Sequence, residues 1–204
     1  MPSPTPAMFI ADATGLDFLN SVATPVNVTV DWIDDGDGLI DWLGQAHLVP
    51  ADVLVAMRGG AMPGELDRLA EQARELREWF RGFVREHKGK PLTSASLREL
   101  DPLNRLLARD EGYGRVVALD SGTIGFERVR RWTSPESLLL PVAEAMATLV
   151  AEEDFSYVKA CEGPTCTLLF ADHTRGHVRR WCSMSACGNR AKQLAHRQRV
   201  GSRA

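Results

Sequence analysis

Cysteine is absent from the first 160 residues of this 204-residue chain, and all four cysteines lie between positions 161 and 187. A secreted disulfide scaffold distributes its bridges through the fold, so this confinement argues against one and favours a metal site. Long apolar runs are also absent, since no stretch approaches the roughly 20 residues that cross a bilayer. The opening MPSPTPAMFIAD lacks the basic start and apolar core of a signal peptide. We therefore expect a cytoplasmic protein with no membrane partner.

Motifs of common catalytic sites are missing as well. The sequence contains no Gly-rich phosphate loop, no nucleophile elbow and no two-histidine metal motif. The aspartates of segment 31–41 do not have EF-hand spacing, so a helix cap in a solvated loop, with Asp37 as the candidate capping residue, is favoured over a cation site. We predict that the chain is not an enzyme.

The net charge of −3 conceals a strong asymmetry along the chain. Residues 155–204 carry nine Lys/Arg and two Asp/Glu, whereas residues 1–154 carry 15 Lys/Arg and 25 Asp/Glu. Opposite charges segregated in this way indicate two parts with different partners, or two parts that attract each other.

The apolar pattern predicts an α+β protein with a mainly helical N-terminal domain, residues 1–154. A 3.6-residue period marks a helix over 64–87, and a second helical pattern over 94–107 contains Pro102, which predicts a kink or a split. Two β-type runs, 115–119 and 123–129, flank Asp-Ser-Gly and predict a small hairpin. Helix returns over 134–152 before the acidic run at 152–154.

The cysteines form two C-x4-C pairs, Cys161 with Cys166 and Cys182 with Cys187. Four thiolates suit one tetrahedral, structural Zn²⁺ with no open position for water. A strand–turn–strand pattern surrounds the first pair, and Cys187 precedes a helical pattern, where a thiolate is favoured by the helix dipole. We predict a treble-clef-like zinc module over 155–204. Disulfides and an iron–sulfur cluster remain as alternatives of equal weight, and a catalytic zinc ranks below both.

Two segments of the sequence resemble a known family. The run 179–192 is similar to the CGNR-type zinc finger, which is named after the four residues that match Cys187, Gly188, Asn189 and Arg190. Its pattern includes an upstream C-x4-C and an aromatic–acidic pair, matched loosely by Phe170 and Asp172. The run 16–21 resembles the opening signature of the ABATE domain, with Ser21 in place of Thr. The resemblance implies a stress-induced transcription regulator.

The basic C-terminal helix is the candidate nucleic-acid contact. Arg and Asn/Gln side chains contact base edges, and Lys and Arg bind phosphates. The residues expected to contact nucleic acid, DNA rather than RNA, are Arg179, Arg180, Asn189, Arg190, Lys192, Gln193, His196, Arg197 and Arg199. The alternatives are a structural face that supports the zinc site and a protein–protein interaction module without nucleic-acid binding.

Two polar residues of the ABATE-like signature are candidates for a ligand site. Asp17 and Asn20 lie one turn apart on the first predicted helix. They either line a pocket for a small-molecule ligand that the N-terminal domain senses, or tie the helix to the chain around it. The second interpretation is favoured.

Overall fold

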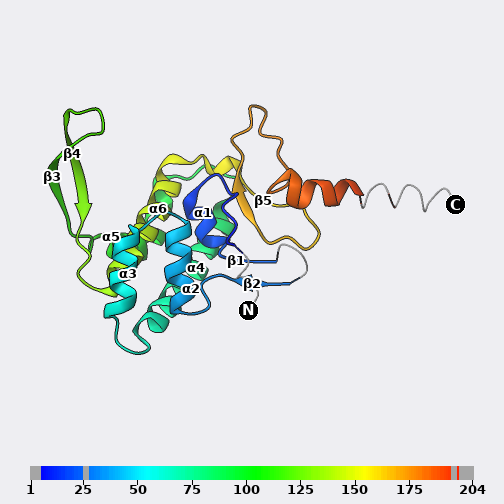
Figure 1. Cartoon of the computed structure of the whole chain (residues 1–204). Helices are drawn as coiled ribbons and strands as arrows, with labels where there is room; N and C mark the ends of the chain where they lie inside the picture. Colours follow the sequence, from blue (N-terminus) through cyan, green and yellow to red (C-terminus); the bar gives the residue numbers. More distant parts are fainter. Residues whose placement is uncertain (1–5, 25–27, 194–196, 198–204) are drawn as a thin grey trace.

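The computed structural model describes residues 6–24, 28–193 and 197. Figure 1 shows a helical body at the centre, a long hairpin that leaves one side, and the cysteine-bearing segment at the other side. The helices are α1 (Thr14–Leu19), α2 (Gly36–Gln45), α3 (Ala51–Gly60), α4 (Glu65–His87), α5 (Asp101–Leu107) and α6 (Leu140–Glu152). The predicted α+β class with a mainly helical N-terminal part is confirmed.

Six short strands form three separate two-stranded antiparallel sheets within the described residues. The strands are β1 (Val22–Ala23), β2 (Val30–Asp31), β3 (Gly112–Ala118), β4 (Ile124–Arg130), β5 (Val158–Ala160) and β6 (Leu169–Ala171). Four tight helical turns complete the elements: η1 (Ser94–Leu100), η2 (Pro135–Leu139), η3 (Phe155–Tyr157) and the π-helical turn η4 (Met184–Gly188).

Helix α1 lies at the centre of the body, where it packs on α4, α6 and β6. Leu16, Phe18 and Leu19 are fully buried, so this short helix is held by tertiary packing rather than by its own propensity. Gly15 allows α6 to come close, because a Cβ at this position would lie 2.7 Å from the Ala145 carbonyl oxygen.

Helix α4 buries an apolar stripe, as its sequence period predicts, but it also buries two arginines. Arg77 donates to both carboxylate oxygens of Asp31, at 2.8 and 2.7 Å, and to the Ser21 hydroxyl at 2.9 Å. Arg81 donates to the Leu19 carbonyl oxygen. These bonds join α4 to the end of α1 and to the segment that follows it. The sequence pattern does not predict them.

Of two helix details that the sequence predicts, the split at Pro102 is confirmed and the cap at Asp37 is wrong. The predicted helix over 94–107 is divided into η1 and α5, because Pro102 occupies the first turn of α5 and cannot donate to the preceding turn. The cap of α2 is Asp35, whose carboxylate accepts from the Gly38 N–H at 2.7 Å, so Asp37 is not the capping residue.

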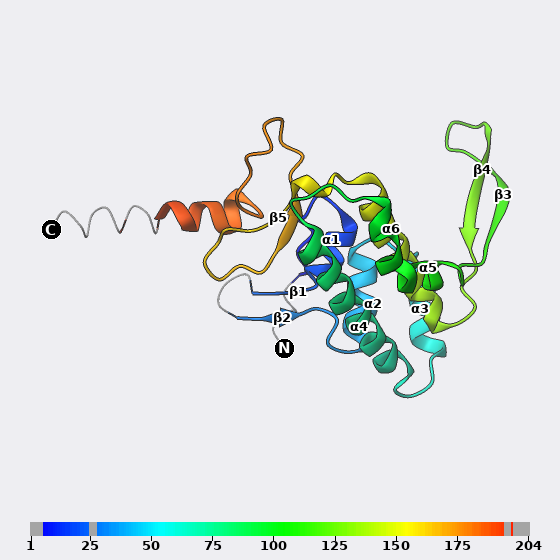
Figure 2. The same cartoon turned by 180° about the vertical axis from the view of Figure 1, so that it is seen from behind.

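Strands β3 and β4 form a hairpin that projects from the body, as Figures 1 and 2 show from opposite sides. Its register pairs Val116 with Phe126 and Ala118 with Ile124. Val116, Ile124 and Phe126 are 70%, 81% and 73% exposed. The predicted hairpin is therefore confirmed, with its apolar side chains in solvent.

The cysteine-bearing segment packs on α1 through β6. The Ala171 N–H donates to the Ala11 carbonyl oxygen at 2.9 Å, and Phe155, Phe170 and Leu169 belong to the same hydrophobic core as the helices. No described helix is long and apolar enough to span a bilayer.

Candidate metal centre

The first cysteine pair lies on the turn between β5 and β6. The Cys161 N–H donates to the Leu168 carbonyl oxygen at 2.9 Å, and the Cys166 N–H donates to the Gly163 carbonyl oxygen at 3.0 Å. Gly163 also donates its N–H to the Cys161 sulfur at 3.4 Å. The turn therefore presents both sulfurs on the same side while backbone amides point at one of them.

The second pair lies on the segment that follows β6. The Cys182 N–H donates to the Cys161 sulfur at 3.3 Å, and the Glu162 N–H donates to the Arg180 carbonyl oxygen at 2.9 Å. Cys187 lies in η4, which Ser183 caps by accepting from the Ala186 N–H at 2.9 Å. A helix continues from Asn189, so Cys187 stands at its start as the sequence predicts.

The four sulfurs fit one zinc ion. Their Sγ atoms all lie within 4.8 Å of one another, and Cys166 and Cys182 are 3.9 Å apart. A tetrahedral site with Zn–S bonds of about 2.3 Å needs sulfurs about 3.8 Å apart, whereas a disulfide needs about 2.05 Å. A Cβ on Gly163 would lie 3.1 Å from the Cys187 sulfur, so the backbone itself closes one side of the site. The four cysteines form one closed zinc site.

The environment of the sulfurs explains why a cation is needed. The hydrogen bond from Cys182 lowers the pKa of the Cys166 thiol to about 5, and donating that bond, together with burial, raises the pKa of Cys182 far above its usual range. Burial raises the pKa of Cys187 to about 12. Neighbouring thiols this close cannot all ionise unless a cation compensates, so zinc binding releases protons.

Comparison with known proteins agrees with this geometry. The ABATE family model, described as "Putative stress-induced transcription regulator", matches residues 12–153, and the CGNR zinc finger model matches residues 157–200. The chain belongs to the ABATE family. Its four cysteines are the zinc site of a CGNR finger. A search of curated proteins found no match. Below, residues 12–153 are called the ABATE body and residues 157–200 the CGNR finger.

A buried carboxylate organises the loop between the two cysteine pairs. Asp172 is 0% exposed, and it accepts from Lys159 Nζ at 2.7 Å, from the Thr174 hydroxyl at 2.6 Å and from the Arg179 N–H at 2.9 Å. Burial would raise its pKa, but these hydrogen bonds hold the pKa well below the usual range. The aromatic–acidic pair of the CGNR resemblance thus has a structural role.

Arg179 occupies the contact between the CGNR finger and the ABATE body. Its guanidinium lies over the Phe170 ring at 4.4 Å and donates to the carbonyl oxygens of Trp181, at 3.0 Å, and Ile10, at 3.1 Å. It also donates to the Cys182 carbonyl oxygen and pairs with Asp12. Because its guanidinium is engaged within the protein, we do not expect Arg179 to contact nucleic acid.

The other basic candidates are placed differently. Arg180 is solvent-exposed, lies over the Trp181 ring and pairs with Glu162 at 2.5 Å. The exposed candidates on the helix that follows Cys187 are Asn189, Arg190, Lys192, Gln193 and Arg197. His196 and Arg199 lie outside the described residues.

Asp17 and Asn20 are both buried and bond to backbone. Asp17 accepts from the N–H groups of Ile10 and Ala11, each at 3.0 Å. Asn20 donates to the Leu169 carbonyl oxygen at 2.8 Å and accepts from the Leu169 N–H at 2.9 Å, which joins α1 to β6 of the finger. These contacts match the favoured interpretation of a structural tie, and neither residue lines the pocket described below.

Proposed function

We propose that the CGNR finger presents the helix after Cys187 to DNA. The observation that carries this proposal is the direction of that helix, which leaves the finger away from the ABATE body in both views (Figures 1 and 2). Its exposed face carries Arg190, Lys192 and Arg197 with the amides Asn189 and Gln193. These are the side chains that bind phosphates and base edges, and the closed zinc site supplies a rigid base for them.

Charge reversal at the three cations tests this proposal. The triple variant Arg190→Glu, Lys192→Glu, Arg197→Glu should bind duplex DNA at least about 100-fold more weakly at 0.1 M salt than the natural chain. The slope of log affinity against log salt should also become shallower by about 3. Fluorescence anisotropy with a labelled duplex measures both quantities.

The matched control changes one Lys and two Arg on the body. The variant Lys90→Glu, Arg98→Glu, Arg105→Glu has the same charge change at exposed positions of the loop before η1, of η1 and of α5. It should keep most of the DNA affinity. Equal losses in the two triple variants would contradict the proposal, because they would reflect net charge alone.

The alternative is a protein-interaction module, and one observation favours it. Val178 is 76% exposed and Met184 is 47% exposed, and both lie on the finger. A contiguous apolar patch in solvent is a mark of protein contacts, so this alternative requires Val178 and Met184 to contribute to one such surface. Binding through them would change little with salt, so the salt slope separates the two functions.

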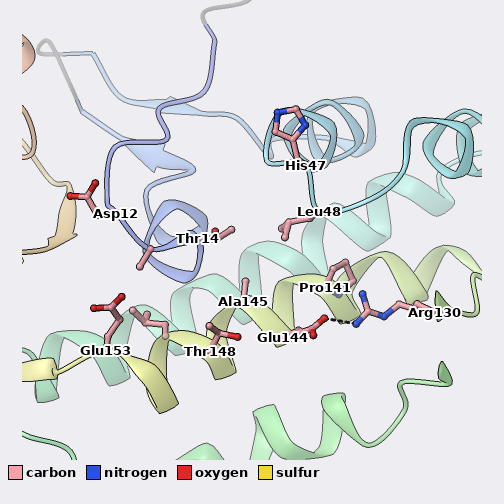
Figure 3. Close-up of a pocket in the computed structure, with 12 residues that line it drawn as sticks. Asp12, Thr14, His47, Leu48, Arg130, Pro141, Glu144, Ala145, Thr148 and Glu153 are labelled. Atoms are coloured by element: carbon pink, nitrogen blue, oxygen red, sulfur yellow. Dashed lines mark hydrogen bonds and ion pairs between the residues drawn. The ribbon is translucent and has the colours of Figure 1, made fainter. Parts of the chain in front are cut away.

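We further propose that the ABATE body senses a small ligand. A cavity of about 440 Å³ lies between the start of α1, the segment His47–Leu48 and α6, and Figure 3 shows its lining. This volume is within the range of small-molecule sites, roughly 300–1,000 Å³. The cavity adjoins the contact with the CGNR finger, since Asp12 and Glu153 line it.

A further inference from the structure

One face of the β3–β4 hairpin is apolar and lies in solvent. Cross-strand partners of an antiparallel pair share a face, so the register places Val116 beside Phe126. The next pair on this face, towards the tip, is Ala118 with Ile124. The Phe126 ring also covers Gly114, where a Cβ would lie 2.2 Å from the ring. We call this surface the apolar face.

The opposite face of the hairpin is covered by polar contacts. Arg115 pairs with its cross-strand partner Glu127, and the Arg131 guanidinium lies 4.8 Å from the centre of the Tyr113 ring. A sheet with one polar and one apolar face normally buries the apolar one. A two-stranded hairpin by itself is also only marginally stable in water, so the apolar face needs a covering partner.

A hollow of about 650 Å³ lies at the base of the hairpin, where the strands join the body. We call it the basal hollow. Arg128 lines it and also belongs to the apolar face, since its cross-strand partner is Gly114. The apolar part of the lining includes Pro50, Leu107 and Trp132. The apolar face therefore continues into the basal hollow.

Opposite charges lie at the two ends of the apolar face. Arg128 lies at the basal end and Asp120 in the turn at the tip, and both are exposed. Among the residues that the structure describes, neither side chain forms a hydrogen bond or an ion pair. Asp110, whose pKa the Arg128 charge helps to lower, is already bonded by Arg130 through both carboxylate oxygens. About 13 Å of strand separates Arg128 from Ile124, next to the turn, so Arg128 and Asp120 cannot pair within one chain.

We propose that the apolar face is the interface of a homodimer, in which the hairpins of two copies pack face to face with their tips in opposite directions. A two-fold axis between the faces and perpendicular to the strands relates the copies. Each tip then lies at the basal hollow of the other copy, which gives it room. Asp120 of one copy meets Arg128 of the other, twice per dimer. Packing with the tips in the same direction would instead bring like charges together.

The small size of this interface sets the expected affinity. Strands of seven residues span about 23 Å, so two hairpins bury less than the roughly 1,600 Å² of a standard interface. We therefore expect a reversible dimer with a dissociation constant on the order of 10 µM. The CGNR finger lies on the other side of the body (Figures 1 and 2), so dimerisation leaves both fingers uncovered.

Sedimentation velocity of the zinc-loaded full chain without DNA, from about 1 to about 200 µM, tests self-association. Ile124→Ser removes an apolar contact from both copies and should raise the dissociation constant about tenfold. The matched control is Val55→Ser, because Val55 is 73% exposed but lies on α3, away from the hairpin. It should change the dissociation constant by less than about twofold. Circular dichroism confirms that each variant is folded.

Charge exchange tests the opposed direction of the two hairpins. Asp120→Arg alone and Arg128→Asp alone should each weaken dimerisation about tenfold, because each brings like charges together at two contacts. The double variant Asp120→Arg, Arg128→Asp rebuilds both pairs, and its dissociation constant should return to within about threefold of that of the natural chain. Glu71→Arg, at an exposed position of α4, is the control for net charge and should have little effect.

Three results would overturn the proposal. The first is a chain that stays monomeric over the whole concentration range. The second is an equal loss in Ile124→Ser and Val55→Ser, because the interface would then lie elsewhere. The third is a loss in the single charge variants without recovery in the double variant, because the two hairpins would then not lie with opposed tips.

Discussion

At the scale of single residues, Asp172 shows how one buried charge positions a loop. Three groups from separate points of the chain, Lys159, Thr174 and the Arg179 amide, all donate to it. A buried carboxylate is tolerated only when its oxygens accept hydrogen bonds, and both oxygens of Asp172 do so. These hydrogen bonds therefore hold the segment from Arg179 to Cys182 in one conformation.

Replacement of this carboxylate by an amide should be costly. In Asp172→Asn, one oxygen becomes an NH2 donor that faces either Lys159 and the Arg179 N–H or the donors of Thr174, and the Lys159 charge loses its partner. We therefore expect a loss of roughly 3 kcal/mol in the free energy of unfolding. Urea denaturation at pH 7 measures this loss. A change below about 0.5 kcal/mol would show that the network contributes little.

The same residue predicts a pH dependence. The folded-state pKa of Asp172 is below its ordinary value of 3.8, so the folded state favours the carboxylate. Its stabilisation is present above the unfolded pKa and is lost as pH falls below about 4, towards the folded pKa. The melting temperature of the natural chain should therefore fall more between pH 6 and pH 3.5 than that of Asp172→Asn. Acid also protonates the zinc ligands, but it does so in both proteins, so the difference isolates Asp172.

At the scale of elements, the contact between α1 and α6 depends on one missing side chain. A Cβ on Gly15 would lie 2.7 Å from the Ala145 carbonyl oxygen and 3.0 Å from Leu149 Cβ. Both atoms belong to a packed helix that has no room to withdraw. The wall that α6 gives to the cavity and the packing of β6 on α1 both depend on this close contact between α1 and α6.

Gly15→Ala should therefore destabilise the chain by about 1–3 kcal/mol, because the two helices are forced apart. Gly59→Ala is the matched control: Gly59 is also helical, in α3, and a Cβ there has nothing within 4 Å. That substitution should stabilise by up to about 1 kcal/mol through helix propensity. Thermal denaturation of both variants gives the comparison, and equal effects would contradict the role of close packing at Gly15.

At the scale of the whole molecule, the ABATE body and the CGNR finger share one hydrophobic core. Leu169 and Phe170 of the finger pack with the helices of the body, and Asn20 of the body bonds to the backbone of β6. Contacts of this kind make neighbouring parts unfold together. The zinc ion, although it touches only the finger, therefore stabilises the body.

Removal of zinc should lower the stability of the entire chain. We expect a strong chelator to lower the melting temperature of a single cooperative transition by at least about 10 °C, because metal binding contributes directly to folding. Near-ultraviolet circular dichroism of a Trp181→Phe variant follows the body, because Trp42 is buried in the core and Trp181 is the tryptophan of the finger. A body signal that melts at the same temperature with and without zinc would contradict the shared core.

The sequence predicted what depends on local pattern. Helix 64–87, the hairpin around Asp-Ser-Gly and the cysteine spacing all carry their signals within a few residues, and the structure has these elements within a few residues of the expected bounds. The contacts of Arg179 and Arg77 could not be predicted in this way, because their partners Asp12 and Asp31 lie 167 and 46 residues away in sequence. The cavity depends on such distant contacts as well.

The double hydrogen bond between Asn20 and Leu169 also has a consequence for how the chain folds as it is made. The two residues are 149 positions apart, so α1 leaves the ribosome long before its partner strand exists. Until β6 arrives, the Asn20 amide and one side of α1 stay open to solvent, and such surfaces are where a growing chain aggregates. Completion of the body therefore waits for the CGNR finger to be synthesised and, with it, for the capture of zinc.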